Sequence, residues 1–312
     1  MSVAGCLLLY SVAMVLFGPT VLARLTRGGS APRFGVAAWL IAIASVLATW
    51  VAIPILVVLD VISHGGQHDS LLASCVQLLC DVAAGRAGSA PQTVLLVVAA
   101  ALIVAVARVA MKLLRTVRRL HAHAHRHAQA VRLVGRPTEQ QDVFVVDAGE
   151  RTAYCVAGKP PAIVVTTGAI AALDCRALQA VLAHERAHLD GHHPNVVTVL
   201  RGLAMVFSRL ALMTRGATEV ARLLEMCADD VAARRHGQHT LLTGLMALAG
   251  ATPAQALGAA DVALLSRAER LALPPAPRAR ASARAGLSGA ITLIALAPVG
   301  TFILGAAGLL CA

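Results

Sequence analysis

Aromatic and charged residues are both scarce in this chain of 312 residues. Phenylalanine, tryptophan and tyrosine together make up 3% of it and charged residues 14%, whereas hydrophobic residues make up 58%. Nucleic-acid binding calls for basic residues interleaved with aromatic ones, so the lack of aromatics argues against that function despite a net charge of +11. The mean hydropathy of +0.73 places the chain among membrane proteins.

Four stretches are apolar enough and long enough to cross a bilayer. The first resembles a signal peptide in length, but Arg24 and Arg27 follow it instead of preceding it, so we interpret it as a retained anchor. A further apolar stretch, 196–213, contains two arginines and is predicted to be an amphipathic helix packed on the folded domain or lying at the membrane surface. The predicted spans are residues 5–23, 36–59, 93–107 with a continuation to 114, and 285–310.

Arginine placement predicts the side of the membrane on which each segment lies. Arginines dominate the loop after the first span, the segment after the third and the segment before the fourth, whereas the loop 60–91 holds three aspartates and one arginine. By the positive-inside rule, both chain ends and this loop are external, and residues 115–284 are cytoplasmic. The net charge then reflects clusters that orient the protein and meet anionic lipid headgroups.

Cysteine is present without the CxxC spacing of a metal site. Cys75 and Cys80 lie in the predicted external loop, where a disulfide and two free thiols are equally compatible with the sequence. Cys155, Cys175 and Cys227 are expected to be cytoplasmic and therefore reduced.

Residues 184–188, His-Glu-Arg-Ala-His, form an HExxH pattern within a predicted helix. On a helix, His184 and His188 are one turn apart on the same face, so both imidazoles can bind one zinc ion. Glu185 projects beside them and is placed to take a proton from water at the ion.

The ends of this helix decide which other histidines can reach the metal. Asp174 is the predicted N-cap and Gly191 the predicted end of the helix. His192 and His193 follow at once, but the last histidine of the longer pattern HExxHxxGxxH would fall on Pro194. We therefore interpret His192 and His193 as capping or rim residues and not as ligands.

A second segment offers the third ligand. Glu225 and Asp229 are four residues apart, hence on one face of a helix that is otherwise largely apolar. Since buried acids need a cation, we predict that Glu225 binds the zinc ion and that Asp229 fixes the tautomer of a ligand histidine. The alternative is an acidic patch on an exposed helix.

The sequence around these motifs predicts an α+β domain over 115–284. Its histidine-rich beginning, 121–127, is interpreted as a solvated helix and not as a metal-sensing tract, because histidines two apart on a helix do not converge. The run 162–166 is either an edge strand that pairs with an extended substrate or an ordinary core strand. The expected elements are strands at 142–146, 152–156 and 162–166, helices at 218–236, 238–249 and 253–273, and a flexible basic linker at 274–284.

Three motifs together resemble the BlaR/MecR-type membrane metallopeptidases and, more distantly, HtpX-like and CAAX prenyl proteases: VVTTG at 164–168, the residues 180–188, and Glu225-x-x-Ala-Asp229. This resemblance implies a gluzincin-type zinc peptidase in a bacterial cell membrane, with His184, His188 and Glu225 as ligands and Glu185 as the acid/base. The chain ends at Ala312, directly after the fourth span, so we expect it to lack the external penicillin-binding domain of the receptors.

We therefore expect a mainly α membrane protein, with four transmembrane helices and a cytoplasmic α+β zinc metallopeptidase domain between the third and fourth. It would bind one zinc ion per chain and cleave a peptide bond of a winged-helix BlaI-like repressor or of the chain itself. A membrane quality-control protease and a non-catalytic zinc-binding receptor are the alternatives. The candidates for oxyanion or substrate contacts are Tyr154, Arg234, Arg235, His236, Ile163, Val164 and Val165.

Overall fold

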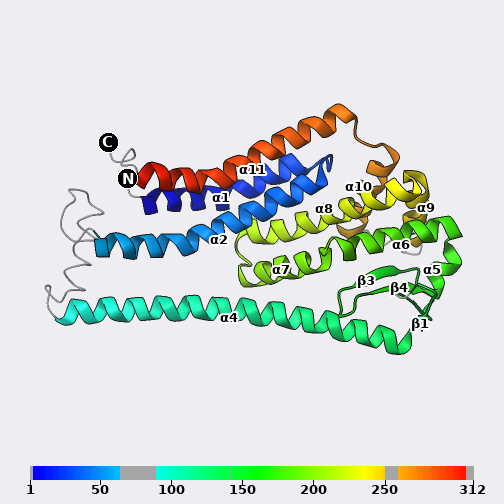
Figure 1. Cartoon of the computed structure of the whole chain (residues 1–312), viewed down its shortest axis with the longest axis horizontal. Coiled ribbons are helices and arrows are strands. Elements are labelled where there is room, and N and C mark those ends of the chain that lie inside the picture. Colours follow the sequence, from blue (N-terminus) through cyan, green and yellow to red (C-terminus); the bar gives the residue numbers. More distant parts are fainter. Residues whose placement is uncertain (1–2, 64–88, 141, 250–258, 307–312) are drawn as a thin grey trace.

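The computed structural model describes residues 3–63, 89–140, 142–249 and 259–306. Three long helices, α1 (Val3–Thr26), α2 (Pro32–Ser63) and α11 (Pro277–Ala306), pack side by side (Figure 1). Each holds a stretch that is long and apolar enough to cross a membrane, so the protein is a multi-pass membrane protein. Within the described residues these stretches are Gly5–Thr26, Pro32–Leu56 and Pro277–Thr301.

The predicted third span lies within α4 (Ser89–Val134), an unbroken helix of 46 residues that also carries the histidine-rich stretch. The side chains of most of residues 93–107 are not described, and the candidate spans come only from described residues. The third span therefore stays a prediction. Cys75, Cys80 and most of the predicted external loop lie outside the described residues.

Polar side chains join the three membrane helices to one another. The Tyr10 hydroxyl on α1 donates a hydrogen bond of 3.0 Å to the backbone carbonyl of Ile294 on α11 and lies 2.8 Å from the Ser45 hydroxyl on α2. Trp50 Nε1 on α2 donates to the Ser11 hydroxyl on α1 at 2.7 Å. Where lipid supplies no hydrogen-bond partners, such pairs fix how neighbouring helices sit against one another.

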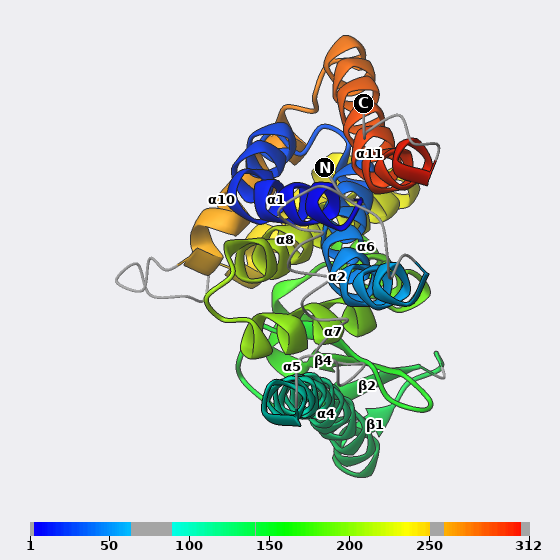
Figure 2. The ribbon, with the colours of Figure 1, turned by 90° about the vertical axis from the view of Figure 1, so that its left-hand side faces the viewer.

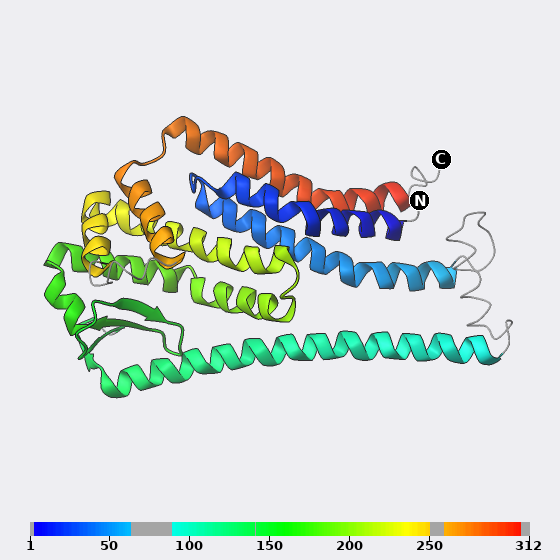
Figure 3. The ribbon, with the colours of Figure 1, turned by 180° about the vertical axis from the view of Figure 1, so that it is seen from behind.

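A small mixed sheet lies at the opposite end of the molecule from the first turns of α1 and the last turns of α11 (Figure 3). Its order is β1-β2-β4-β3, with β2 and β4 parallel and the other pairs antiparallel. The three predicted runs correspond to its longer strands. The strands are β1 (Arg136–Pro137), β2 (Val143–Val146), β3 (Ala153–Val156) and β4 (Ala162–Thr166).

Of the two interpretations of 162–166, the ordinary core strand is confirmed and the edge strand is wrong. β4 lies between β2 and β3, so its ladder hydrogen bonds are used on both sides, and all five of its residues are buried. The edge strands of the described sheet are β1 and β3, and β3 pairs only with β4. A substrate that added a strand next to β4 would have to displace one of its neighbours.

The two faces of the sheet pack on different helices. Ala128 and Val131 of α4 pack on one face, together with Tyr154 and Val164. Leu182 of α6 (Cys175–Asp190) packs on the other. Because side chains alternate along a strand, Ala153 and Cys155 of β3 face α6, while Tyr154 faces α4.

The remaining helices correct two further predictions. The stretch 196–213 is not one helix: α7 ends at Val206 and α8 begins at Ala211, because the backbone leaves helical geometry at Phe207. The segment 274–284 is mostly not a linker, since α11 begins at Pro277 and continues through alanine and arginine, which favour helix. The elements in this region are α5 (Thr167–Ala172), α7 (His193–Val206), α8 (Ala211–His236), α9 (Gln238–Ala249) and α10 (Ala259–Ala272).

The largest hydrophobic core joins the membrane helices to α8. Trp39 of α2 is fully buried, and Gly216 of α8 approaches it so closely that a Cβ there would lie 2.9 Å from Ile43 and 3.3 Å from the Trp39 ring. At Gly35 of α2, a Cβ would lie 3.0 Å from Leu223 of α8. Viewed along the helices, α8 and α6 lie between α1 and α11 on one side and α7, the sheet and α4 on the other (Figure 2).

Candidate metal centre

The helix with the HExxH residues begins and ends as its sequence predicts. The Asp174 carboxylate accepts a hydrogen bond of 2.7 Å from the Ala177 amide, and the Gly191 amide donates to the Ala187 carbonyl at 3.0 Å. Between these caps, His184, Glu185 and His188 are buried.

Three donor atoms from α6 and α8 meet at one point. The Nε2 atoms of His184 and His188 are 3.1 Å apart. Glu225 of α8 places Oε2 at 3.5 Å from the first and Oε1 at 3.4 Å from the second. Among the residues that the structure describes, this is the one group of histidine, cysteine or acidic side chains arranged to hold a metal ion.

These separations fit zinc. With metal–ligand bonds of about 2.0–2.1 Å, the donors of a tetrahedral zinc ion lie about 3.3 Å from one another. Two imidazole nitrogens and one carboxylate oxygen also form the donor set of catalytic zinc sites, in which the fourth position is open. The donors of this chain therefore suit a zinc ion both in kind and in spacing.

Asp229, the predicted partner of a ligand histidine, lies beside His184. Its side chain is 0% exposed, and its Oδ1 is 3.1 Å from His184 Nδ1. The contact is close but too bent for a regular hydrogen bond. It nevertheless favours a proton on Nδ1, which leaves Nε2 free to bind metal.

Arg267 of α10 is a member of the site that the sequence did not indicate. Its Nε and Nη2 donate to the two carboxylate oxygens of Asp229 at 2.9 and 2.7 Å, and its Nη1 lies 3.0 Å from Glu225 Oε2. One guanidinium thus holds both acids of α8. In the sequence, a single arginine on a helix is normally interpreted as a solvated residue. No pattern near Arg267 indicates a contact with His184, which is 83 positions away.

The charged groups of the site shift one another's pKa values. Burial alone would lower the pKa of His184, but the Asp229 and Glu225 carboxylates outweigh it and raise the pKa to about 9. Burial would raise the pKa of Glu225, yet hydrogen bonds from His184 and His188 and the charge of Arg267 hold it well below its usual range. Burial would likewise raise the pKa of Asp229, and the hydrogen bonds from Arg267 together with the close contact to His184 lower it instead.

His193 is not at the rim of the site. Its Nδ1 lies 3.0 Å from Nδ1 of His188, and the two rings meet edge to face. Burial, followed by the charge of His188, lowers the pKa of His193 to about 4, so that its neutral ring can accept a hydrogen bond from His188. His192 is the N-cap residue of α7, with a left-handed backbone (φ 53°) and no side-chain cap hydrogen bond.

Cys155 of β3 is a second residue of the site without a sequence signal. Its thiol lies beside the Glu185 carboxylate. Burial, and then the charge of Glu185, raise the pKa of the thiol, so Cys155 stays protonated. Burial also raises the pKa of Glu185 above that of an exposed carboxyl.

The other predicted contact residues are not gathered at the metal centre. Tyr154 lies on the opposite face of the sheet from α6, where its hydroxyl is 3.1 Å from His127 Nε2 of α4. The residues of β4 proposed to contact substrate are buried in the sheet: Ile163, Val164 and Val165. The last turn of α8 carries three exposed cations with no contact to the zinc donors among the described residues: Arg234, Arg235 and His236.

Two histidines one turn apart, with an acid between them and a carboxylate ligand from a neighbouring helix, define a zinc metallopeptidase site. The model of peptidase family M48 matches residues 114–272, just over half of the chain, and the chain belongs to this family. No curated protein and no solved structure matches the chain. The protein is therefore a membrane zinc metallopeptidase of family M48.

Proposed function

We propose that this metallopeptidase is an endopeptidase that cleaves protein substrates on the cytoplasmic side of the membrane. The observation that carries the proposal is the buried carboxylate of Glu185, which projects from the same helix turn as two zinc donors and is not itself among them. A purely structural zinc site has no need of such a base.

A zinc ion held by His184, His188 and Glu225 would supply a Lewis acid for water and the peptide carbonyl. Glu185 accepts the proton of the attacking water and later delivers it to the leaving amine. Burial raises the pKa of Glu185, which favours its uptake of the proton from water. Asp229 and His193 hold the two imidazoles in orientation, and Arg267 keeps Glu225 and Asp229 ionised.

The substrate is proposed to pair with β3 and not with β4. β3 has one described neighbour in the sheet, and its residues Ala153 and Cys155 face α6. An extended peptide added to this edge lies near the Glu185 carboxylate, because Cys155 of β3 is its neighbour. Backbone pairing of this kind selects extended substrates with little regard to sequence.

The cytoplasmic location is supported by the arginine distribution and by the fold. α1, α2 and α11 have their arginine-bearing ends on the side of the molecule that carries the sheet, and the first turn of α1 and the last turn of α11 lie at the other end (Figure 1). Positive ends remain in the cytoplasm during insertion. The boundaries 1–114, 115–284 and 285–312 remain the proposed organisation of the chain.

The catalytic proposal is tested with three variants of the full chain, purified in detergent. Glu185→Gln is expected to keep its zinc and to lose cleavage of itself and of a co-expressed candidate repressor. Glu225→Ala is expected to lose zinc as well. Glu139→Gln makes the same chemical change at an exposed site and should leave both properties intact. Equal cleavage by Glu185→Gln and wild type would overturn the assignment of Glu185.

The orientation is tested separately through Cys175, which is exposed at the start of α6. In a variant that keeps Cys175 as its only cysteine, a membrane-impermeant maleimide should label intact cells weakly and permeabilised cells fully. Full labelling of intact cells would place the peptidase on the external side and leave its chemistry unaffected.

The identity of the substrate rests on the BlaR/MecR resemblance alone. A winged-helix BlaI-like repressor, or the chain itself, is the substrate expected from that resemblance, and damaged membrane proteins are the alternative. Cells that produce the inactive Glu185→Gln variant distinguish them. Accumulation of one intact repressor supports the signalling role, whereas accumulation of many membrane proteins supports quality control.

A further inference from the structure

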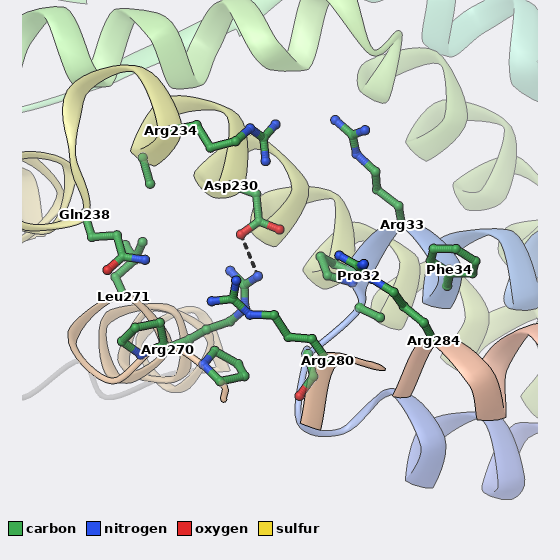
Figure 4. Close-up of a pocket in the computed structure, with 15 residues that line it drawn as sticks. Pro32, Arg33, Phe34, Asp230, Arg234, Gln238, Arg270, Leu271, Arg280 and Arg284 are labelled. Atoms are coloured by element: carbon green, nitrogen blue, oxygen red, sulfur yellow. Dashed lines mark hydrogen bonds and ion pairs between the residues drawn. The ribbon is translucent and has the colours of Figure 1, made fainter. Parts of the chain in front are cut away.

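A basic cavity of about 510 Å³ lies on the membrane side of α8 and α10, apart from the zinc donors. The turn between α1 and α2 and the first residues of α2 form one wall, and the start of α11 forms another (Figure 4). None of His184, His188 and Glu225 lines it. The cavity is thus a separate feature of the fold.

Arginine dominates its lining. Asp230 is the one acid there, and it is paired with Arg270 at 2.6 Å. The other four guanidinium groups form no hydrogen bond and no ion pair in the described part of the chain. These unpaired arginines, which come from α2, α8 and α11, are Arg33, Arg234, Arg280 and Arg284.

The cavity also lies where the membrane helices begin and end. The apolar stretch of α1 ends at Thr26, and those of α2 and α11 begin at Pro32 and Pro277. Phe34 in the lining is 38% exposed, and Leu25, one residue before the end of α1 and outside the lining, is 42% exposed. A ligand in this place therefore meets charge on one side and apolar surface on the other.

We infer that this cavity binds the phosphate group of an anionic phospholipid from the leaflet on the sheet side of the membrane. Planar guanidinium groups donate paired hydrogen bonds that match phosphate oxygens. Four unpaired arginines from three elements supply more positive charge than a zwitterionic headgroup would neutralise. The apolar residues at the mouth favour a lipid over free phosphate, because acyl chains can follow the exposed apolar side chains of the spans. This inference rests on the membrane location and not on the catalytic role.

The test compares two triple variants of the full chain in non-ionic detergent. The cavity variant carries Arg234→Gln, Arg280→Gln and Arg284→Gln. The control removes the same charge from exposed neighbours outside the lining: Arg27→Gln, Arg235→Gln and Arg278→Gln. Native mass spectrometry measures retention of phosphatidylglycerol and phosphatidylcholine, and zinc content and thermal unfolding report whether each variant is folded.

Wild type and the control should retain phosphatidylglycerol in preference to phosphatidylcholine. The cavity variant should bind phosphatidylglycerol about a hundredfold more weakly, at roughly fivefold for each arginine removed. Equal weakening in both variants would overturn the inference, because it would show general attraction between a basic surface and anionic lipid. If inorganic phosphate at constant ionic strength displaces phosphatidylglycerol at a similar concentration, the site is one for free anions and the lipid assignment is wrong. Should the cavity variant lose its fold, Arg284→Gln alone, set against Arg278→Gln, gives the same comparison with a fivefold effect.

Discussion

Two neighbouring acids on α8 are held by two arginines of α10, and their surroundings differ. Asp229 and Arg267 belong to the metal centre, where the carboxylate is 0% exposed and receives two hydrogen bonds from one guanidinium. Asp230 and Arg270 are one residue and one turn further along, where the carboxylate is 31% exposed and borders the basic cavity. The same ion pair is therefore expected to be indispensable in the first setting and replaceable in the second, since the energetic importance of a charge depends on whether water can reach it.

The largest difference should come from removing each arginine. Arg267→Met leaves Asp229 charged and buried without a guanidinium, which should cost about 3–5 kcal/mol of unfolding free energy. Arg270→Met leaves a carboxylate that water can reach, and should cost about 1 kcal/mol or less. Denaturant unfolding in micelles with excess zinc measures both. Equal losses would show that burial does not separate the two pairs.

Zinc affinity should separate the two acids. Asp229→Asn removes the acceptor at His184 Nδ1, and the loss of such a partner weakens metal binding about 10- to 100-fold. Asp230 does not contact a ligand histidine, so Asp230→Asn should leave the zinc affinity within about twofold of wild type. Competition with a chromophoric chelator measures both values. A similar loss in the two variants would mean that net charge, and not contact with His184, supports the metal.

The number of protons released on zinc binding should also differ between the Asp229 and Asp230 variants. In the zinc-free protein the pKa of His184 is raised to about 9, so the ring is protonated below that pH and must lose a proton to bind metal. Zinc binding near neutral pH should therefore release this proton, and the apparent affinity should rise with pH until about 9. Calorimetry in buffers of different ionisation enthalpy counts the protons. Asp229→Asn lowers this pKa and should reduce the release, whereas Asp230→Asn should not.

The smallest effect is expected from reversing the outer pair. Asp230→Arg combined with Arg270→Asp restores an ion pair and loses the hydrogen bond from Arg270 to the Gly29 carbonyl. The change should amount to about 1 kcal/mol in unfolding free energy, with zinc content unaltered. Zinc content and thermal unfolding in detergent check this prediction. Loss of zinc from the reversed pair would show that the outer pair supports the metal centre after all.

The sequence predicted those parts of the site that lie on one helix face. His184, Glu185 and His188 share a helix with readable caps, and Glu225 and Asp229 share another with their spacing of one turn. Arg267 and Cys155 reach the site from α10 and β3, and their positions depend on packing across the fold that no local pattern encodes. A tertiary contact made by a single residue carries no periodic signal.

The incorrect fold predictions have a common cause. The stretch 196–213 is continuously apolar, which hides the turn at Phe207 between two helices. The arginines and prolines of 274–284 resemble a linker by composition, although the chain is helical from Pro277. β4 and β3 are similar in sequence character, and only strand order decides which of them lies at the edge. Composition reveals the environment of a segment more readily than its boundaries or its neighbours.

The family match begins at residue 114, yet the helix that supplies Glu225 is packed against α2, far outside the match. A shortened chain of residues 114–272 would expose to water the face of α8 that now rests on Trp39, Ile43 and Gly35. Such a fragment would retain every zinc donor and lose part of the packing that keeps them together. Water-soluble preparations of this peptidase should therefore be prone to aggregation, and detergents that loosen helix contacts should inactivate it before they unfold the sheet.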